Sequence, residues 1–299
     1  MTKEWLAFTF KDQNTIKLTD IDLAKLLDAS DKVVQNAYKR MELSDKHKWL
    51  QNTNYEVSFI LRECNLSRNN MLIDFGCGIG RHAVELASQG VNVQGVDFVE
   101  QNIEAANKAK NERGLQNIAF YKDDCRSIKL EQKADAAICL YDVIGSYVDN
   151  NENYKMLQNI YDHLKFGGTA LISVMNFELT DFKAKHRFSL TNNPDELLNI
   201  KPSNIMETTG NVFDPDFYWI DNDKKIVYRR EQFKRGTALP LELFVRDKRF
   251  TLYEITSMCK EVGFEVVYAR YVNAKDWDTA LLPTDDAAKE ILVKCEKNS

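Results

Sequence analysis

The sequence predicts an α/β protein built on a doubly wound, mostly parallel sheet. Strand-like apolar runs alternate with helical patterns from Met71 to Met175. This alternation is typical of parallel sheets that are covered by helices on both faces. A glycine-rich turn follows the first of these strands, and an acidic residue closes the second. We expect a seven-stranded sheet whose last strand is antiparallel.

The first strand and its turn form the central motif, Met71-Leu-Ile-Asp-Phe-Gly-Cys-Gly-Ile-Gly-Arg-His82. Glycines stand at the alternate positions Gly76, Gly78 and Gly80, and a helical pattern follows directly. A strand, a glycine turn and a helix N-terminus let the backbone approach a nucleotide-like ligand closely. A dinucleotide-binding fingerprint requires its third glycine three residues after the second, where this chain has Arg81. Glycines also mark plain tight turns, so the motif needs support from other residues.

That support comes from Asp97, which closes the predicted strand 91–97 and lies 21 residues after Gly76. A doubly wound fold places a carboxylate at this distance to bind ribose hydroxyls. A carboxylate suits the position because it accepts two hydrogen bonds from a vicinal diol. The alternative is that Asp97 caps the following helix, 99–113. The glycine turn and the acid at this separation together favour the ribose role.

The pattern D-x-G-x-G-x-G from Asp74 to Gly80 resembles the S-adenosylmethionine (SAM) loop of class I methyltransferases. The resemblance runs without a break from about Met71 to Met175 and includes the Gly-Gly turn before the fifth strand, 169–175. It implies the class I methyltransferase (Rossmann-like) fold, SAM as cofactor and S-adenosyl-L-homocysteine (SAH) as product. The cofactor-binding residues that it implies are Asp74, Gly76, Cys77, Gly78, Gly80, Asp97, Phe98, Asp124, Cys125 and Leu140.

Two of these residues follow the third predicted strand, 117–121. By the same resemblance, Asp124 pairs with the adenine amino group and the backbone of Cys125 donates to the ring. The alternative for this segment is a solvated turn with an Asx cap.

The loop after the fourth predicted strand, 134–141, faces the transferred methyl group in the family. DNA adenine and glutamine methyltransferases have an Asn/Asp-Pro-Pro-Tyr/Phe tetrapeptide here, whereas this chain has Tyr-Asp-Val-Ile without proline. The loop instead resembles that of small-molecule methyltransferases, including glycine N-methyltransferase relatives. Asp142 and Tyr147 are therefore the catalytic candidates, as substrate contacts that assist proton loss. An equal alternative for Asp142 is capping of the loop's own amides. Arg246 and Tyr218 are weaker candidates for substrate contact.

The chain divides into four predicted segments. They are an N-terminal helical extension or lid at 1–65, a SAM-binding core at 66–176, an antiparallel β cap at 177–250 and the end of the core sheet at 251–299. Helices are expected at 20–27 and 31–41. Trp49 and Tyr55 are candidates for the lid, and the alternative makes them core aromatics of a helix that runs to Cys64.

The cap is predicted from strand-like runs in a region without strand–helix alternation. Strands are expected at 217–220 and 226–233, joined by a hairpin turn, and at 241–245. Such inserts cover the substrate cavity in related enzymes; the alternative is a structural or dimer-forming sheet. After the cap, Thr251 and Glu254 predict a capping box for the helix 252–262. Strands at 264–272 and 291–295 then complete the sheet.

Composition narrows the class of protein. A net charge of −5 over 299 residues argues against nucleic acid as the main partner. The sequence has neither an apolar run of membrane-spanning length nor an N-terminal signal segment, so a cytoplasmic location without membrane contact is expected. The six cysteines lack metal-type spacing and are expected to be reduced, with no metal bound. His163, on the predicted helix 153–164, is expected at the surface or at a cap.

The leading prediction is a SAM-dependent methyltransferase that acts on a nitrogen or oxygen of a small molecule. Whether the chain forms a homodimer is left open. Two alternatives are an RNA or protein methyltransferase that docks through the N-terminal helices and the cap, and a SAM-binding protein without catalysis.

Overall fold

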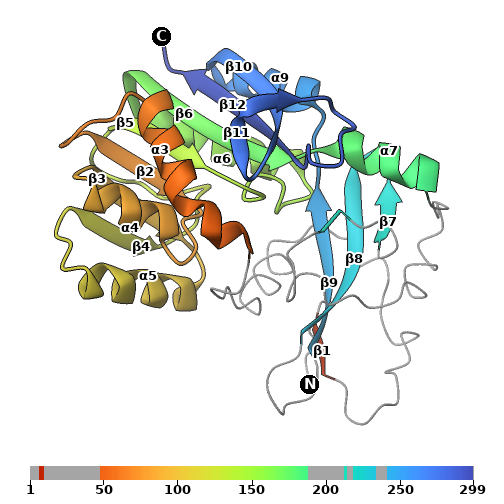
Figure 1. Cartoon of the computed structure of the whole chain (residues 1–299), viewed down its shortest axis with the longest axis horizontal. Coiled ribbons are helices and arrows are strands. Elements are labelled where there is room, and N and C mark those ends of the chain that lie inside the picture. The colour runs from red at the N-terminus through yellow and green to blue at the C-terminus, as the bar shows by residue number, and fades with distance from the viewer. Residues whose placement is uncertain (1–6, 10–47, 188–211, 214–217, 234–240, 299) are drawn as a thin grey trace.

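A computed structural model describes residues 7–9, 48–187, 212–213, 218–233 and 241–298. Its main sheet has eight strands in the order β11-β10-β12-β6-β5-β2-β3-β4. The five strands from β6 to β4 are parallel, and β12, β10 and β11 are antiparallel (Figure 1). The strands are β2 (Met71–Phe75), β3 (Asn92–Asp97), β4 (Ile118–Lys122), β5 (Ala134–Cys139), β6 (Leu164–Met175), β10 (Glu265–Asn273), β11 (Asp276–Leu281) and β12 (Glu290–Glu296).

The predicted fold is confirmed, and the predicted number of strands is one too few. The additional strand, β11, lies at the edge of the sheet and pairs with β10. Its sequence, Asp-Trp-Asp-Thr-Ala-Leu, has a single large aromatic among polar residues, so it lacks the apolar alternation of a half-buried strand. Trp277 is fully buried, with its ring 5.3 Å from that of Phe59. Tertiary packing of this one side chain holds the edge strand.

Helices cover both faces of the sheet (Figure 1). One apolar cluster joins the sheet to α3 (Thr53–Glu63) and α4 (Arg81–Ser88), and α5 (Glu100–Glu112) packs beside α4. A second cluster joins the other face to α6 (Asn150–His163) and α9 (Leu252–Val262). A short 3-10 helix, η2 (Lys48–Asn52), precedes α3. The apolar positions that predicted the helices are the ones buried on the sheet.

The predicted antiparallel cap forms a separate sheet in the order β1-β9-β8-β7. Its strands are β1 (Ala7–Thr9), β7 (Tyr218–Asp221), β8 (Ile226–Phe233) and β9 (Leu241–Lys248). The strands expected at 217–220, 226–233 and 241–245 are thereby confirmed. The pairing of β1 with β9 was not predicted. The helices expected at 20–27 and 31–41 lie outside the described residues.

The sequence indicated no helix between the core and the cap, whereas the structure has one, α7 (Phe177–Arg187). Asn176 begins the helix, because its side-chain oxygen accepts a hydrogen bond from the amide of Leu179 at 3.3 Å. Asparagine is a preferred residue at this position. Only a few residues of α7 are described as packing in apolar clusters, namely Phe177, Leu179 and Ala184. The sequence of the helix therefore carries only a weak apolar periodicity.

Two smaller predictions concern the capping box of α9 and the position of His163 on α6. The capping box is confirmed, since Thr251 and Glu254 each accept a hydrogen bond from the other's amide, at 3.2 and 3.0 Å. Of the two positions expected for His163, the surface one is wrong and the capping one is confirmed. Its Nε2 accepts from the amide of Leu130 at 3.0 Å and its Nδ1 donates to the carbonyl of Asn159 at 2.7 Å. Burial lowers the pKa of His163, so the ring is a neutral, buried cap.

All six cysteines are free and buried. They pack as small apolar side chains, as expected. In the part of the chain that the structure describes, no helix is both long and apolar enough to cross a membrane.

Candidate functional site

The glycine turn connects β2 to α4 at the carboxyl end of the parallel strands. Gly76, Gly78 and Gly80 have φ angles of +76°, +54° and +77°, a region that glycine adopts without steric cost. A Cβ on Gly76 would lie 2.4 Å from the side chain of Val143, and one on Gly80 would lie 2.8 Å from the ring of Phe120. Glycine is therefore required at both positions by backbone conformation and by close packing.

The same turn exposes the start of a helix. Gly80 is the N-cap of α4, and the first turn of α4 has no side-chain cap. Uncapped amide groups at a helix N-terminus attract negatively charged groups. Asp74, at the end of β2, lies nearby with 4 % of its surface exposed, and no described residue donates a hydrogen bond to its carboxylate. Burial raises the pKa of Asp74 to about 7.

Asp97 fastens the glycine turn to the end of β3. Its Oδ2 accepts a hydrogen bond from the amide of Gly78 at 2.9 Å, and its Oδ1 accepts from the amide of Val99 at 2.8 Å. The N-cap of α5 is Val99, without a side-chain cap, so Asp97 is not the cap residue of this helix. Oδ1 also accepts from the side-chain amide of Asn102 at 3.4 Å, so Oδ2, with one donor and two lone pairs, is the oxygen that can accept a further hydrogen bond from a ribose hydroxyl.

Asp124 and Cys125 follow β4, next to Asp97, whose carbonyl accepts from the amide of Asp123 at 3.1 Å. Both oxygens of Asp124 bind the guanidinium of Arg126, at distances from 2.6 to 3.1 Å. Burial alone would raise the pKa of Asp124, but the hydrogen bonds from Arg126 lower it. The amide of Cys125 donates to no described residue. The carboxylate of Asp124, which also accepts from the amide of Arg126 at 2.9 Å, is thus held by Arg126, and the amide of Cys125 stands beside it as a donor.

Tyr147, the second catalytic candidate, lies in the core. It is 4 % exposed, and the guanidinium of Arg126 lies 4.2 Å from the centroid of its ring. Its place is therefore in the core beneath the Asp124–Arg126 pair. The predicted contact of Tyr147 with the substrate rests on the sequence alone.

The loop after β5 reaches the site with an unusual backbone conformation. Leu140 is buried, and Tyr141 has a φ of +65°, which is uncommon for a residue other than glycine. The amide of Tyr141 donates to the hydroxyl of Ser173 on β6. Asp142 follows, half-buried, and its carbonyl accepts from the hydroxyl of Ser146 at 2.7 Å. Positive φ angles of this kind concentrate at functional sites.

A fully buried carboxylate, Glu56 on α3, joins the glycine turn to this loop. It accepts hydrogen bonds from Arg81, from Nε2 of His82 at 2.6 Å and from the hydroxyl of Tyr141. The guanidinium of Arg81 also lies 5.0 Å from the centroid of the Tyr141 ring. Burial lowers the pKa of His82 to about 4, so the imidazole is neutral and donates from Nε2. These contacts fix two walls of the site relative to each other.

The sequence analysis missed this cluster. The three donors lie 25, 26 and 85 residues from Glu56, so no local spacing connects them. The available signal was the position of Glu56 beside Val57, Phe59 and Ile60, all buried. A charged residue on the buried side of a helix must find partners elsewhere in the fold.

Of the two lid candidates, Tyr55 has a different role from the one expected. Its hydroxyl accepts from the amide of Trp277 at 2.7 Å and donates to Asp278 at 3.0 Å, which fastens α3 to β11. The alternative, a core aromatic of a helix that runs to Cys64, is confirmed for Tyr55. The side chains of Trp49, Tyr218 and Arg246 lie outside the described residues.

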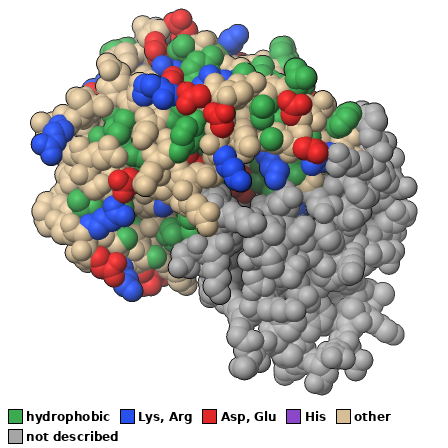
Figure 2. All heavy atoms as spheres, viewed as in Figure 1, with side chains coloured by type: hydrophobic (Ala, Val, Ile, Leu, Met, Phe, Trp, Pro, Cys, Tyr) green, Lys and Arg blue, Asp and Glu red, His purple; other side chains and the backbone are tan. Residues whose placement is uncertain are grey.

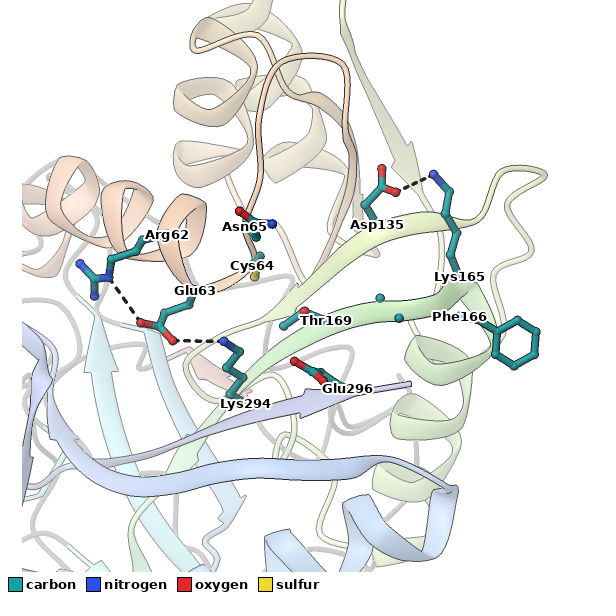
Figure 3. Close-up of a pocket in the computed structure, with 12 residues that line it drawn as sticks. Arg62, Glu63, Cys64, Asn65, Asp135, Lys165, Phe166, Thr169, Lys294 and Glu296 are labelled. Carbon is teal, nitrogen blue, oxygen red and sulfur yellow. Dashed lines mark hydrogen bonds and ion pairs between the residues drawn. The ribbon is translucent and has the colours of Figure 1, made fainter. Parts of the chain in front are cut away.

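A groove of about 530 Å³ lies at the opposite edge of the sheet (Figure 3). Its lining includes Glu63 from the end of α3, Asp135 from the start of β5 and Lys294 from β12. The charged side chains are paired, Lys165 with Asp135 at 2.7 Å and Lys294 with Glu63 at 3.4 Å. None of the predicted site residues lines this groove.

The residues at the carboxyl edge fit a ligand that has an amino acid end and a nucleoside end. The amides of α4 suit a carboxylate, Asp97 suits a ribose diol, and Asp124 with Cys125 suits an adenine edge. All lie at the ends of β2, β3 and β4, where ligands bind in open α/β sheets.

Comparisons with known proteins find similarity to methyltransferases. Residues 72–168 match a family model described as a methyltransferase domain. The ubiquinone biosynthesis O-methyltransferase of Rickettsia canadensis (strain McKiel) is 35% identical over 105 residues. This match covers 35% of the chain and 42% of the relative, so the chain spans less than half of that relative's length.

Two solved structures share most of the fold. The CcbJ methyltransferase from Streptomyces caelestis has a TM-score of 0.63 at 14% identity, over 89% of this chain and 96% of that one. Magnesium protoporphyrin IX methyltransferase (ChlM) from Synechocystis PCC 6803, solved with bound SAH, has a TM-score of 0.50 at 16% identity, over 88% and 91%. At these identities the likeness shows the fold.

Proposed function

We propose that this chain, whose residues 72–168 match a methyltransferase domain, is a class I SAM-dependent methyltransferase that transfers the methyl group of SAM to an oxygen or nitrogen of a small molecule. The observation that carries the proposal is the meeting of the glycine turn, Asp97 and Asp124 at one edge of the sheet. A nucleoside with an amino acid end matches the order of these groups. The curated O-methyltransferase relative supports a small-molecule acceptor.

When bound, SAM supplies a methyl group that its sulfonium has already activated. The protein's task is then to bind, align and keep water away, rather than to form a covalent intermediate. Asp97 and the α4 N-terminus would hold the two ends of the cofactor, and the loop after β5 would present the acceptor. The contacts of Glu56 keep that loop and the glycine turn in a fixed relation.

The small-molecule proposal is favoured over an RNA substrate by the charge pattern. Figure 2 shows Lys and Arg side chains interspersed with Asp and Glu on the described part of one face. Binding to RNA depends on concentrated basic charge along the phosphate backbone. Methyl transfer from labelled SAM to separate amine, hydroxyl and RNA pools identifies the acceptor class. Binding without turnover in every pool would instead favour a SAM-binding protein without catalysis.

The cofactor assignment is tested by calorimetry with SAM and SAH on the wild type, Asp97→Asn and Asp135→Asn. Loss of hydrogen bonds to a charged group costs about 1.5–3 kcal/mol, so Asp97→Asn should raise the Kd for SAM about 10- to 100-fold. Asp135 is the matched control, because it is an aspartate at the opposite edge of the same sheet. Equal affinity of the Asp97 variant and the wild type would refute the ribose role.

A further inference from the structure

Glu290 is a buried acid that the proposed function has not yet used. It is the first residue of β12 and pairs with Met175, the last residue of β6. Because β12 is antiparallel, its first residue lies at the carboxyl edge of the parallel strands. The side chain is 7% exposed, and its Oε2 accepts no hydrogen bond. A buried carboxylate oxygen without a donor is costly and requires a reason.

The pattern of β12 places this side chain on the cofactor side of the sheet. Side chains alternate along a strand, so Glu290 points to the same face as Leu292, which packs in the cluster of α3 and α4. On the neighbouring strand, Ser173 pairs with Leu292 and faces the same way. The hydroxyl of Ser173 accepts a hydrogen bond from the amide of Tyr141 in the loop after β5, which we call the acceptor loop. Glu290 therefore lies beside the point where this loop is bound to β6.

The electrostatic neighbours of Glu290 identify the groups around it. Burial raises the pKa of Glu290 to about 7, and the negative charges of Glu56 and Asp142 raise it as well. A hydrogen bond with Ser173 and the charge of Arg81 act in the opposite direction. Among these carboxylates, Glu56 already has three donors, whereas Oε2 of Glu290 has none. Asp142 directly follows Tyr141, whose amide is bound by Ser173 beside Glu290, so this geometry brings a half-buried acid and a buried acid to the same place.

We propose that Asp142 and Glu290 form an acid pair at the acceptor position, in which Asp142 takes the proton of the acceptor and Glu290 acts through Asp142 as a positioning residue. This inference rests on the proposed function and names its acceptor class, a hydroxyl or amine that carries a proton. A lone pair of the acceptor oxygen or nitrogen forms the new bond to the methyl carbon. The methyl–sulfur bond breaks and leaves its electron pair on sulfur. The acceptor's proton passes to the Asp142 carboxylate and later to water.

The physical reason for a pair is that two close carboxylates do not both stay ionised easily. Their mutual repulsion favours a state in which they share one proton. Glu290 would thereby raise the proton affinity of Asp142, which as an isolated aspartate is a weak base. General bases act best when their pKa lies near the working pH.

The pair can be tested without knowledge of the acceptor by using sinefungin, a SAM analogue with an ammonium group in place of the methyl sulfonium. Its ammonium reaches toward the acceptor position, where the acid pair would attract it. We expect Glu290→Gln to lower the affinity for sinefungin relative to SAH at least 10-fold. Glu63→Gln, the same change at the opposite edge of the sheet, should alter this ratio less than 2-fold.

The pH dependence gives a readout that a structural role would not produce. In the wild type, the affinity for sinefungin relative to SAH should fall as the pH decreases through about 7. In Glu290→Gln this fall should disappear. In the described part of the chain, the charged or titratable groups that act on Glu290 are Glu56, Arg81, Asp142, Tyr141 and Lys289. All of them remain in the Gln variant, so the difference between the two proteins isolates Glu290.

Asp142→Asn provides a second variant at a more exposed position, and it should lose the same preference. The double variant should lose no more than either single variant if the two acids act as a unit. If Glu290→Gln left the ratio of sinefungin to SAH affinity and its pH dependence unchanged, the proposed acid pair would be refuted, and the proposed function would stand. Loss of SAH affinity together with sinefungin affinity would also overturn it, in favour of a structural role. Absence of SAM and SAH binding in the wild type would refute the proposed function itself.

Discussion

The two sheets of this protein are stabilised in different ways. The central sheet packs between two apolar clusters, and the residues of β5 that face them are almost all fully buried and apolar. At the junction of the antiparallel sheet and the core, by contrast, Arg229, Asp247, Lys248 and Arg249 are each at most 4% exposed. Apolar burial leaves a periodic pattern in the sequence, whereas paired charges leave none. The strands of both sheets were predicted, but the charged contacts that join the antiparallel sheet to the core were not.

The charged junction depends on one acid and two guanidinium groups. Asp247 binds Nη2 of Arg229 at 3.0 Å and Nε of Arg249 at 2.9 Å. Arg249 also donates to the hydroxyl of Thr180 on α7 at 2.6 Å and to the carbonyl of Val212 at 2.8 Å. The end of β9 is thus tied to α7 and to the segment 212–213. Such a network specifies one arrangement because each donor needs its acceptor.

The largest expected effect is at this junction. Asp247→Asn removes the negative charge between two buried arginines, which should lower the free energy of unfolding by about 3–5 kcal/mol. Urea unfolding measures this change. Asp223→Asn, in the exposed turn between β7 and β8, is the matched control and should change stability by less than about 0.5 kcal/mol. Similar values for both variants would show that the charges do not hold the cap.

The central sheet should respond to a loss of volume instead. Leu171 on β6 is fully buried, and Leu171→Ala should cost about 2–5 kcal/mol through lost burial and a cavity. Phe166→Ala on the same strand removes a larger side chain that is 77% exposed, so it should cost little. The comparison of the sheets fails if Leu171→Ala costs less than about 1 kcal/mol in the same urea series.

The central sheet contains an exception at the candidate cofactor site, where no described residue donates a hydrogen bond to the buried carboxylate of Asp74. Its pKa is about 7 in the folded protein and about 3.9 in an unfolded chain. The folded state therefore binds more protons, and this acid's contribution to stability is lost as the pH rises toward and through about 7. The stability of ligand-free Asp74→Asn relative to wild type should increase by on the order of 2 kcal/mol between pH 5 and pH 8. A constant difference across this range would contradict the raised pKa.

The smallest expected effect concerns a feature that belongs to neither sheet. Thr251→Ala removes the N-cap of α9, which should cost about 1 kcal/mol. Thermal unfolding of Thr251→Ala and Thr251→Ser measures it, and serine should preserve most of the stability because it keeps the hydroxyl acceptor. Equal losses in the two variants would mean that the methyl group, rather than the cap, is responsible.

Within the candidate site, the interactions between residues close in the sequence were predicted, and those between residues far apart in the sequence were not. Gly76, Gly78, Gly80 and Asp97 form one structural unit, as their spacing predicted, because strand, turn and helix N-terminus are local features. Glu56 and Glu290 were missed because their neighbours come from other elements. Tyr147 was selected for its position in the acceptor loop, but its ring packs beneath Arg126. The direction of a loop side chain depends on tertiary contacts, which cannot be read from the sequence.

The sequence by itself determined the parallel core, the glycine turn with Asp97 beside it, and the capping box of α9. These features follow from local conformational preferences and from the period of apolar residues, which are properties of short segments. Only the tertiary structure decided the edge strand β11, the helix α7, the Glu56 contacts and the charged junction of the cap. In each of these a polar or aromatic side chain finds its partner far along the chain, and burial makes that single pairing decisive.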